Sequence, residues 1–276
     1  MKKVFKKFII LLLVLSISAI PAFAGRKRVT HTQDGSYSKP GDLEAEIRFG
    51  RDLAARILGN YKLLKDEKLI RYVNKVGKSM SLYSGRPELE FYFAVLDTSE
   101  INAFATPGGY IFITKGALMK MDNEAQLASV LGHEIAHVTR RHVVRRLDIR
   151  GDDTSAVSAL SGMIGGATAA FRTLLETSIN KASEILFEKG YKLKEEMEAD
   201  SLGILMAASA GYHPSSLKNF LIKSGGFEKK DATYKSKEHP QLKVRMKTMN
   251  KTLIKNGLLK IKQAKVRRRF HENVKS

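Results

Sequence analysis

The chain has 276 residues, 43% of them hydrophobic, which is enough for one domain with a sizeable core. Lysine and arginine outnumber acidic residues by 48 to 28, giving a formal net charge of +20 at pH 7. There is no cysteine, which excludes disulfides, lipid attachment at a cysteine and thiolate metal ligands. A zinc site in this chain would therefore have to use histidine and carboxylate side chains.

The first 24 residues have the order of a secretory signal peptide. Lysines precede the apolar run FIILLLVLSISAI, and the small residues Ala22 and Ala24 come just before Gly25. The run is short for a membrane span of about 20 residues. We predict a signal peptide over 1–24, a flexible leader over 25–41 and an exported, periplasmic protein. The alternative is an uncleaved anchor that keeps the protein associated with the membrane.

A small sheet follows two predicted helices near 43–57 and 69–80, where apolar residues recur at helical spacing. Within LEFYFAVLD the apolar residues alternate, which is typical of a strand. The turn TPGG then separates INAFA from YIFIT. These segments predict a small antiparallel sheet over 89–114.

The remainder of the chain has mostly helical periodicity. We expect helices over about 123–146, near 192–210 and after Pro240, while the Ala/Gly-rich stretch 154–178 is either a tightly packed helix or a lid. The fold class is therefore α+β, mostly helical, with one domain over 42–256. Residues 257–276 are predicted to be a basic C-terminal tail, either solvated or attracted to an anionic surface.

The segment HEIAH has the spacing H-E-x-x-H of a zinc-binding helix. His133 and His137 leave the same helix face and can hold one metal ion. Glu134 is turned by about 100° from His133, so it can act as general base toward a zinc-activated water. We predict one Zn²⁺ per chain, with Glu134 catalytic. The alternative is a pair of hydrogen-bonded core histidines beside a surface glutamate.

A third ligand is expected in the segment EEMEADSLGILMAASA, because catalytic zinc usually has three protein ligands. Asp200 borders an apolar run, and Glu196 lies four residues earlier on the same helix face. We assign Glu196 to the metal and expect Asp200 to accept a hydrogen bond from a ligand imidazole. Glu195 and Glu198 remain competitors. Alternatively, these acidic residues only stabilise the first turn of a helix.

His142 is expected to lie away from the metal. On a continuous helix it would point about 140° from His137, and it does not have the spacing of a third histidine ligand. We predict that it is a basic surface residue among neighbouring arginines.

HEIAH followed by EMEAD resembles the zinc metallopeptidase family that includes the CAAX prenyl protease, HtpX and BepA. NAFATPGGYIFITKGAL and HPQLKVR resemble two further elements of that family, and the similarity spans about 43–250. The resemblance implies a zincin-like (gluzincin) domain of the soluble exported branch, without the repeat domain that BepA carries. It also implies that His239 and Arg245 lie near the site. His239 in this role would be able to hold the enzyme latent, or it is only a polar residue leading into a helix.

An extended peptide substrate could pair with the small sheet through its main chain. We predict that Tyr110, Ile111 and Phe112 form the edge that receives it, with Asn102 and Ala103 on the neighbouring strand. The alternative is an ordinary core hairpin.

The sequence thus predicts an exported zinc endopeptidase in envelope protein quality control. Its expected substrates are unfolded or misassembled envelope proteins, and an anionic membrane surface is a further expected partner. The alternative function is a non-enzymatic chaperone or assembly factor with a structural zinc. No nucleic acid partner is expected, because charge alone would support it and the export signal opposes it.

Overall fold

The computed structural model describes residues 41–151, 169–224 and 242–275. The predicted signal peptide, nearly all of the leader, most of the Ala/Gly-rich stretch and His239 lie outside these ranges. The elements, in chain order, are α1 (Asp42–Asn60), α2 (Glu67–Ser81), β1 (Tyr92–Leu96), β2 (Ala103–Thr106), η1 (Pro107–Gly109), β3 (Tyr110–Thr114), α3 (Lys115–Lys120), α4 (Glu124–Thr139), α5 (His142–Leu147), α6 (Ala169–Ser183), η3 (Glu184–Lys189), α7 (Leu193–Ser209), α8 (Ser216–Lys223), α9 (Leu242–Lys255) and α10 (Arg267–Val274).

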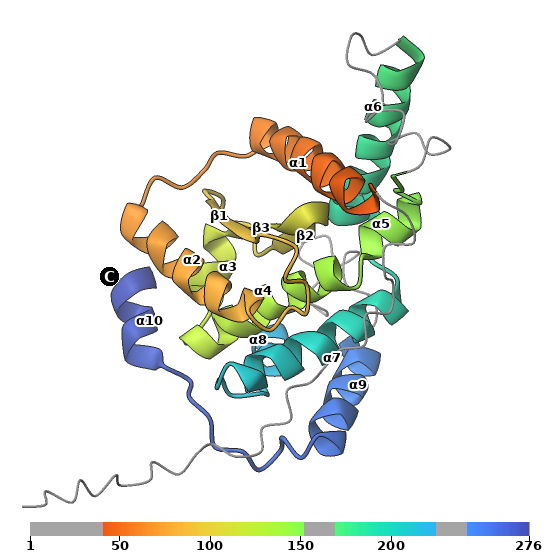
Figure 1. Ribbon diagram of the computed structural model, residues 1–276. Coiled ribbons are helices and arrows are strands. Elements are labelled where there is room, and N and C mark those ends of the chain that lie inside the picture. Colours follow the sequence, from red (N-terminus) through yellow and green to blue (C-terminus); the bar gives the residue numbers. More distant parts are fainter. Residues whose placement is uncertain (1–40, 152–168, 225–241, 276) are drawn as a thin grey trace, which may run out of the picture.

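The predicted α+β fold class is confirmed, and the small sheet lies between helices on both of its faces (Figure 1). Ile111 and Ile113 of β3 face the core that α2, α4 and α7 build, while Phe112 and Phe104 face α1. The rings of Phe104 and Phe112 stack with centroids 5.2 Å apart. This alternation follows from the period of two in a strand, which sends successive side chains to opposite faces.

The sheet is mixed, so the prediction of an antiparallel sheet is wrong for one of its strand pairs. β2 pairs antiparallel with β3 through the tight turn η1, as expected, but β1 pairs parallel with β3 and the strand order is β1-β3-β2. Alternation alone cannot distinguish these arrangements, because a parallel pair needs only a crossover connection, here residues 97–109. As a result β3 is the central strand and β2 is an edge.

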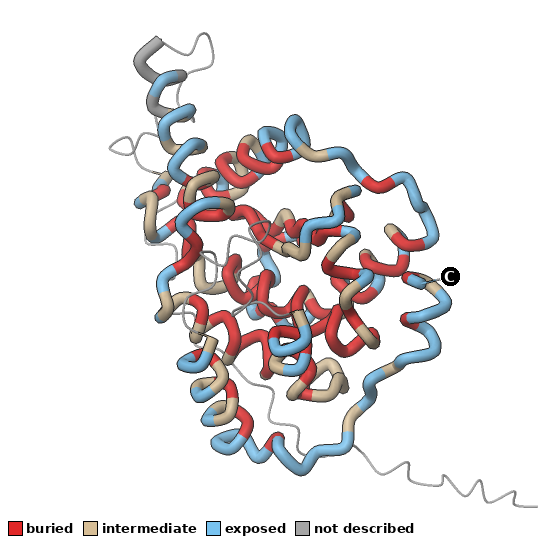
Figure 2. The backbone as a smooth tube through the Cα atoms, turned by 180° about the vertical axis from the view of Figure 1, so that it is seen from behind, coloured by how far each residue is buried: buried red, intermediate tan, exposed pale blue. Residues whose placement is uncertain are grey.

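The helices α4 and α7 pack closely against each other (Figure 1), and α7 buries the face that it turns to α4. Figure 2 shows that the buried segments gather in the middle of the molecule. A Cβ built on Gly203 of α7 would lie 2.8 Å from the backbone nitrogen of His133, and one on Gly132 would lie 3.3 Å from the carbonyl oxygen of Gly203. Only glycine lets two helix backbones approach this closely. The crossing therefore brings His133 directly against α7.

The basic segment after residue 256 packs onto the domain as far as it is described. Phe270 of α10 is fully buried and meets the Tyr72 ring at 6.4 Å. Arg269 donates from Nε to Oε2 of Glu124 over 2.6 Å, and Tyr72 and Tyr212 donate to the same carboxylate. Glu124 is buried in the first turn of α4, so this cluster ties α10 to the helix that carries the histidines.

No helix within the described ranges combines the length and apolarity needed to cross a bilayer.

The Glu124 cluster gives a prediction about stability and pH. Burial raises the pKa of Glu124, but hydrogen bonds from Arg269, Tyr212 and Tyr72 outweigh it, so the net pKa is lowered. Since the folded pKa lies below the unfolded value near 4.3, the carboxylate stabilises the fold above that pH and stops doing so as the pH falls through the folded pKa. Glu124→Gln should lower the free energy of unfolding at pH 7 by about 1–3 kcal/mol.

Urea unfolding at pH 7 and pH 4 measures this difference. The matched control is Glu67→Gln, because Glu67 also lies in the first turn of a helix but is exposed. The control should change stability by less than about 0.5 kcal/mol. A Glu124→Gln effect no larger than the control, or one that grows toward pH 4, would contradict the account.

Candidate metal centre

The helix α4 presents His133 and His137 on one face, one turn apart. Its N-terminus is fixed by the Asn123 side chain, which accepts a hydrogen bond from the backbone nitrogen of Gln126 over 3.1 Å. Both histidines are almost fully buried, and their Nε2 atoms lie 3.0 Å apart. The i, i+4 spacing thus places two nitrogen donors toward one point.

Glu196 of α7 reaches the same point from the opposite helix. Its Oε2 lies 3.6 Å from Nε2 of His133, and its Oε1 lies 3.7 Å from Nε2 of His137. One ligand atom from each of the three residues lies within 4.8 Å of the others. Ligand atoms around a tetrahedral zinc ion at 2.0–2.1 Å are separated by about 3.3 Å, so this spacing fits a single ion.

Hydrogen bonds at the far side of each ring set its tautomer. Asp200 lies one turn after Glu196 on α7, with its Oδ1 3.1 Å from Nδ1 of His133. An ionised carboxylate only accepts, so Nδ1 of His133 donates and its Nε2 carries the lone pair that a metal needs. This is the contact that the sequence predicts for Asp200.

Arg245 of α9 is a buried cation that pairs with the carboxylates of Asp200 and Glu196. It donates to Asp200 through Nε and Nη2 over 2.8 and 2.6 Å, and its Nη1 lies 2.8 Å from Oε2 of Glu196. These contacts hold both carboxylates in place. Burial opposes charge on His133, but Asp200, Glu196 and Glu134 outweigh it and raise the pKa of that ring. The surrounding carboxylates therefore favour positive charge at this position, whether it is a proton on the ring or a metal ion beside it.

His142 is buried behind His137, so the prediction that it lies on the surface is wrong. Its Nδ1 is 2.7 Å from Nδ1 of His137, and its Nε2 is 3.4 Å from Oε2 of Glu198. The prediction assumed a continuous helix over 123–146, but α4 ends at Thr139. Arg141 then adopts a left-handed conformation, with φ of 54°, and the chain turns back toward the site.

The chain Glu198–His142–His137 orients the second ligand. Burial and the nearby charge of Arg145 lower the pKa of His142 to about 4, despite its hydrogen bond to Glu198. A neutral His142 donates from Nε2 to Glu198 and accepts on Nδ1 from Nδ1 of His137. Nε2 of His137 is then left as a lone-pair donor. Glu195, the other competitor for the metal, instead accepts from the backbone nitrogen of Lys192 over 2.7 Å.

Tyr191 is a site residue that the sequence analysis did not identify. Its ring stacks on His137 with centroids 3.9 Å apart and planes 17° apart. Burial, followed by the charges of Glu134 and Glu196, raises its pKa well above the usual range, so the phenol stays neutral. A single tyrosine before a helix belongs to no periodic pattern that would mark it as a site residue. Its position just before α7 is the only signal in the sequence that could have indicated its role.

The edge strand beside the site is β2, and the prediction that β3 is the edge is wrong. Tyr110, Ile111 and Phe112 belong to β3, whose backbone is paired on both sides. Among the described residues β2 is paired on one side only. Asn102 and Ala103, at its start, line depressions that also contain Glu134. His239 lies outside the described residues, so its predicted place near the site stays a prediction.

Comparison with known proteins gives the family. Residues 67–253, more than half of the chain, match the model of Peptidase family M48. The chain belongs to this family of zinc metallopeptidases. The matched range contains HEIAH, the Glu196–Asp200 helix and Arg245.

Two relatives illustrate the similarity. The Beta-barrel assembly-enhancing protease of Escherichia coli (strain K12) is 29% identical over 212 residues, 74% of this chain and 42% of the relative. The Mitochondrial metalloendopeptidase OMA1 of Schizosaccharomyces pombe is 28% identical over 179 residues, 64% of this chain and 51% of the relative. The chain thus spans about half the length of these relatives.

The contact between His142 and His137 predicts that substitutions of His142 change the affinity for zinc. His142→Ala removes the acceptor that fixes the His137 tautomer, so zinc should bind about 10–100-fold more weakly. His142→Gln, which retains an acceptor, should lose less. Competition with a zinc-chelating dye measures the dissociation constant, and the thermal midpoint of the metal-free protein reports folding separately.

His213→Ala is the matched control, because His213 lies in the turn between α7 and α8 and its ring accepts a hydrogen bond on Nδ1 from the nearby backbone nitrogen of Ser215. It should leave the zinc affinity unchanged. Equal affinities of His142→Ala and the wild-type protein would remove His142 from the metal centre.

Proposed function

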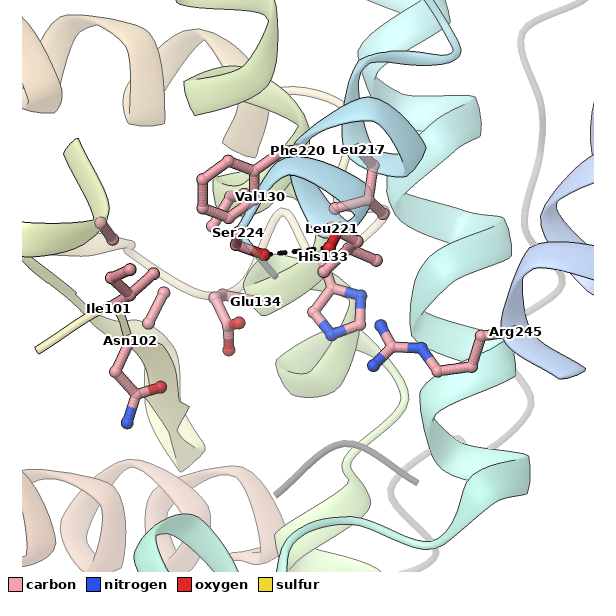
Figure 3. Close-up of a pocket in the computed structure, with 12 residues that line it drawn as sticks. Ile101, Asn102, Val130, His133, Glu134, Leu217, Phe220, Leu221, Ser224 and Arg245 are labelled. Carbon is pink, nitrogen blue, oxygen red and sulfur yellow. Dashed lines mark hydrogen bonds between the residues drawn. The ribbon is translucent and has the colours of Figure 1, made fainter. Parts of the chain in front are cut away.

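We propose that this M48 protein is an exported zinc-dependent endopeptidase with Glu134 as general base. The observation that carries the proposal is the position of Glu134, which is buried beside His133 (Figure 3). Glu134 lines two depressions that both also contain Asn102 and Ala103, at the start of the edge strand. A structural zinc site would have no use for a carboxylate in this position. A peptide lying along β2 would bring its main chain to that carboxylate.

The proposed chemistry divides among a few side chains. Zinc held by His133, His137 and Glu196 would supply a Lewis acid that polarises the scissile carbonyl and lowers the pKa of water. Glu134 takes a proton from the attacking water and passes it to the leaving amine. Asp200 and Arg245 keep the carboxylate of Glu196 and the ring of His133 in position throughout.

The proposed substrates are unfolded or misassembled envelope proteins. Support comes from the relative named Beta-barrel assembly-enhancing protease and from the signal-like segment 1–24. Unfolded chains suit the site, because an edge strand can pair only with a segment whose own backbone hydrogen bonds are open. The proposed location is the periplasm.

Glu134→Gln tests the assignment of the base. The variant should retain one zinc per chain, because Glu134 is not among the three ligands, and should lose casein cleavage by at least about 100-fold. Metal analysis of the purified protein gives the stoichiometry, and release of soluble peptides gives the rate. Glu100→Gln, in an exposed loop, is the control and should cleave normally.

Normal cleavage by Glu134→Gln would exclude Glu134 as the base. Failure of the zinc-loaded wild-type chain to cleave any unfolded protein, together with binding of such proteins, would instead favour a chaperone with a structural zinc.

We further propose that the outer face of α9 contacts an anionic membrane surface. Its exposed lysines recur every four residues, opposite the buried Arg245, Met249 and Leu253, and the helix contains no acidic residue. Like charges four residues apart destabilise a helix, so these lysines do not contribute to the stability of α9. Exposed Ile254, Leu259 and Ile261 lie near these lysines in the chain. We call the row of exposed lysines on α9 the lysine ridge. It consists of Lys243, Lys247, Lys251 and Lys255.

Replacing all four ridge lysines with glutamine should weaken binding to phosphatidylglycerol vesicles by at least about tenfold, since each lysine near an anionic surface contributes about 1 kcal/mol. Vesicle sedimentation at low and high salt measures the binding, which should fall with salt. Phosphatidylcholine vesicles should not bind. The control replaces exposed lysines on other helices and loops, namely Lys62, Lys65, Lys75 and Lys181. An equal loss in both variants would contradict a specific ridge.

A further inference from the structure

A buried carboxylate outside the proposed metal centre, that of Glu46 on α1, joins three separate parts of the chain. Its Oε2 accepts hydrogen bonds from Nε of Arg141 over 3.1 Å and from Nη2 of Arg86 over 3.3 Å. Its Oε1 accepts from the backbone nitrogen of Gly108 over 3.4 Å. Glu46 is fully buried and Arg86 is 5% exposed, so solvent screens these charges only weakly. We call Glu46, Arg86, Gly108 and Arg141 the Glu46 cluster.

The first contact of the cluster reaches the end of the edge strand β2. Gly108 lies in the turn η1 that follows β2 and has a φ of 73°, which glycine adopts without strain. A Cβ at this position would lie 2.8 Å from Cα of Ile47, so the turn rests directly on α1. Thr106, the last residue of β2, donates from Oγ1 to the carbonyl oxygen of Gly50 over 3.0 Å. Contacts with α1 therefore fix the position of the edge strand.

The second contact reaches the last turn of α4, directly after the proposed ligand His137. Nη1 of Arg86 donates to the carbonyl oxygen of Val138 over 3.2 Å. The hydroxyl of Thr139 donates to the carbonyl oxygen of Ser84 over 3.0 Å, which holds the same two segments together. The last carbonyl groups of a helix lack partners within the helix and attract positive charge. Arg86 supplies a donor and a charge, so it links the Glu46 cluster to the end of α4.

The third contact fixes the turn that leads the chain back to the metal centre. Arg141 has a φ of 54°, a conformation that is costly for a residue with a Cβ, and its bond to Glu46 helps to hold it there. The next residue is His142, whose Nδ1 lies 2.7 Å from Nδ1 of His137. Glu46, His137, Arg141 and His142 also line one depression, which encloses about 190 Å³ including its open mouth. The cluster and the second ligand are therefore neighbours.

These contacts connect the parts of the site whose distance matters for the proposed reaction. A peptide would lie on β2, whereas Glu134 and two of the proposed ligands lie on α4. Displacement of reacting groups by about 1 Å can lower a rate about 100-fold. The arrangement also depends on charge, because removing one partner of a buried ion pair leaves the other uncompensated.

We propose that Glu46 is a positioning residue, which holds the edge strand β2 at a fixed distance from the end of α4 that carries His137. It acts through Arg86, Gly108 and Arg141 and takes no part in the proton transfer. The inference rests on the proposed endopeptidase function. Loss of the Glu46 charge should lower kcat more than it raises KM, because a peptide can still pair with β2 while its scissile bond is displaced from Glu134.

Steady-state kinetics of Glu46→Gln test the proposal. The full chain is loaded with zinc, its metal content is measured, and the substrate is a fluorogenic peptide built around a casein bond that the wild-type protein cleaves. The amide keeps an acceptor for Gly108 but leaves both arginines facing a neutral side chain. The kcat per folded molecule should fall by at least about tenfold, while KM should change by less than about threefold.

Two other glutamates provide matched controls. Glu44→Gln changes an exposed residue of the same helix and should leave both kcat and stability unchanged. Glu124→Gln removes an equally buried carboxylate that also has an arginine partner. It should lower the free energy of unfolding without changing the kcat of the folded protein. A purely structural role of Glu46 would make its variant behave like Glu124→Gln.

Glu46→Asp serves if Glu46→Gln does not fold, because it keeps the charge on a shorter side chain. It cannot reach all three partners at once, so its kcat should fall by about threefold or more. An unchanged kcat in whichever variant folds, a rise of KM alone, an equal loss of kcat in Glu124→Gln, or failure of both Glu46 variants to fold would overturn the positioning role. Each of these results leaves the endopeptidase function in place, whereas absence of any cleavage by the zinc-loaded wild-type chain would overturn both.

Discussion

The close crossing of α4 and α7 is the constraint on which the rest of the site depends. Gly132 and Gly203 let the two backbones meet, and one turn of each helix then carries the functional groups toward the other. With any larger side chain at Gly203, the helices would have to separate at the backbone of His133. The distances from Glu196 to both histidines are therefore set by the two glycines as much as by the ligands themselves.

The crossing also concentrates buried charge that needs a cation. Within the described part of the chain, Glu134, Glu196 and Asp200 are buried around His133, and the buried arginine that faces them is Arg245. Three ionised carboxylates and one guanidinium carry a formal charge of −2. Buried charge that is not balanced is costly, so a divalent cation at the three ligand atoms would stabilise this core as well as supply the chemistry. In the proposed function, a peptide on the edge strand lies beside the same charges.

Local signals in the sequence were sufficient for several of the helices and for the shared helix faces of the proposed ligands. Helical spacing predicts α1, α2, α7 and α9, and it places His133 with His137 and Glu196 with Asp200 on shared faces. These inferences need only the geometry of one helix each. The family resemblance added Arg245, whose position near the site no local pattern indicates.

Features that depend on long-range packing could not be predicted in this way. The alternation of apolar residues predicts a strand but not the order of the strands in the sheet. The central position of β3 and the edge position of β2 are therefore known only from the structure. His142 was misplaced because the end of α4 at Thr139 was not recognised, and the left-handed Arg141 has no glycine or asparagine to signal it. Nothing in the sequence distinguishes Tyr191 and Phe270 from other aromatic residues. Their roles follow from the residues that they contact in the structure.

A zinc-bound crystal structure, with the ion located by anomalous scattering at the zinc edge, tests the central claim most directly. The account predicts one ion within about 2.0–2.2 Å of Nε2 of His133, Nε2 of His137 and a carboxylate oxygen of Glu196. Glu134 should lie beside the ion without binding it. An ion elsewhere, or one that Glu134 or Glu198 ligates in place of Glu196, would contradict it.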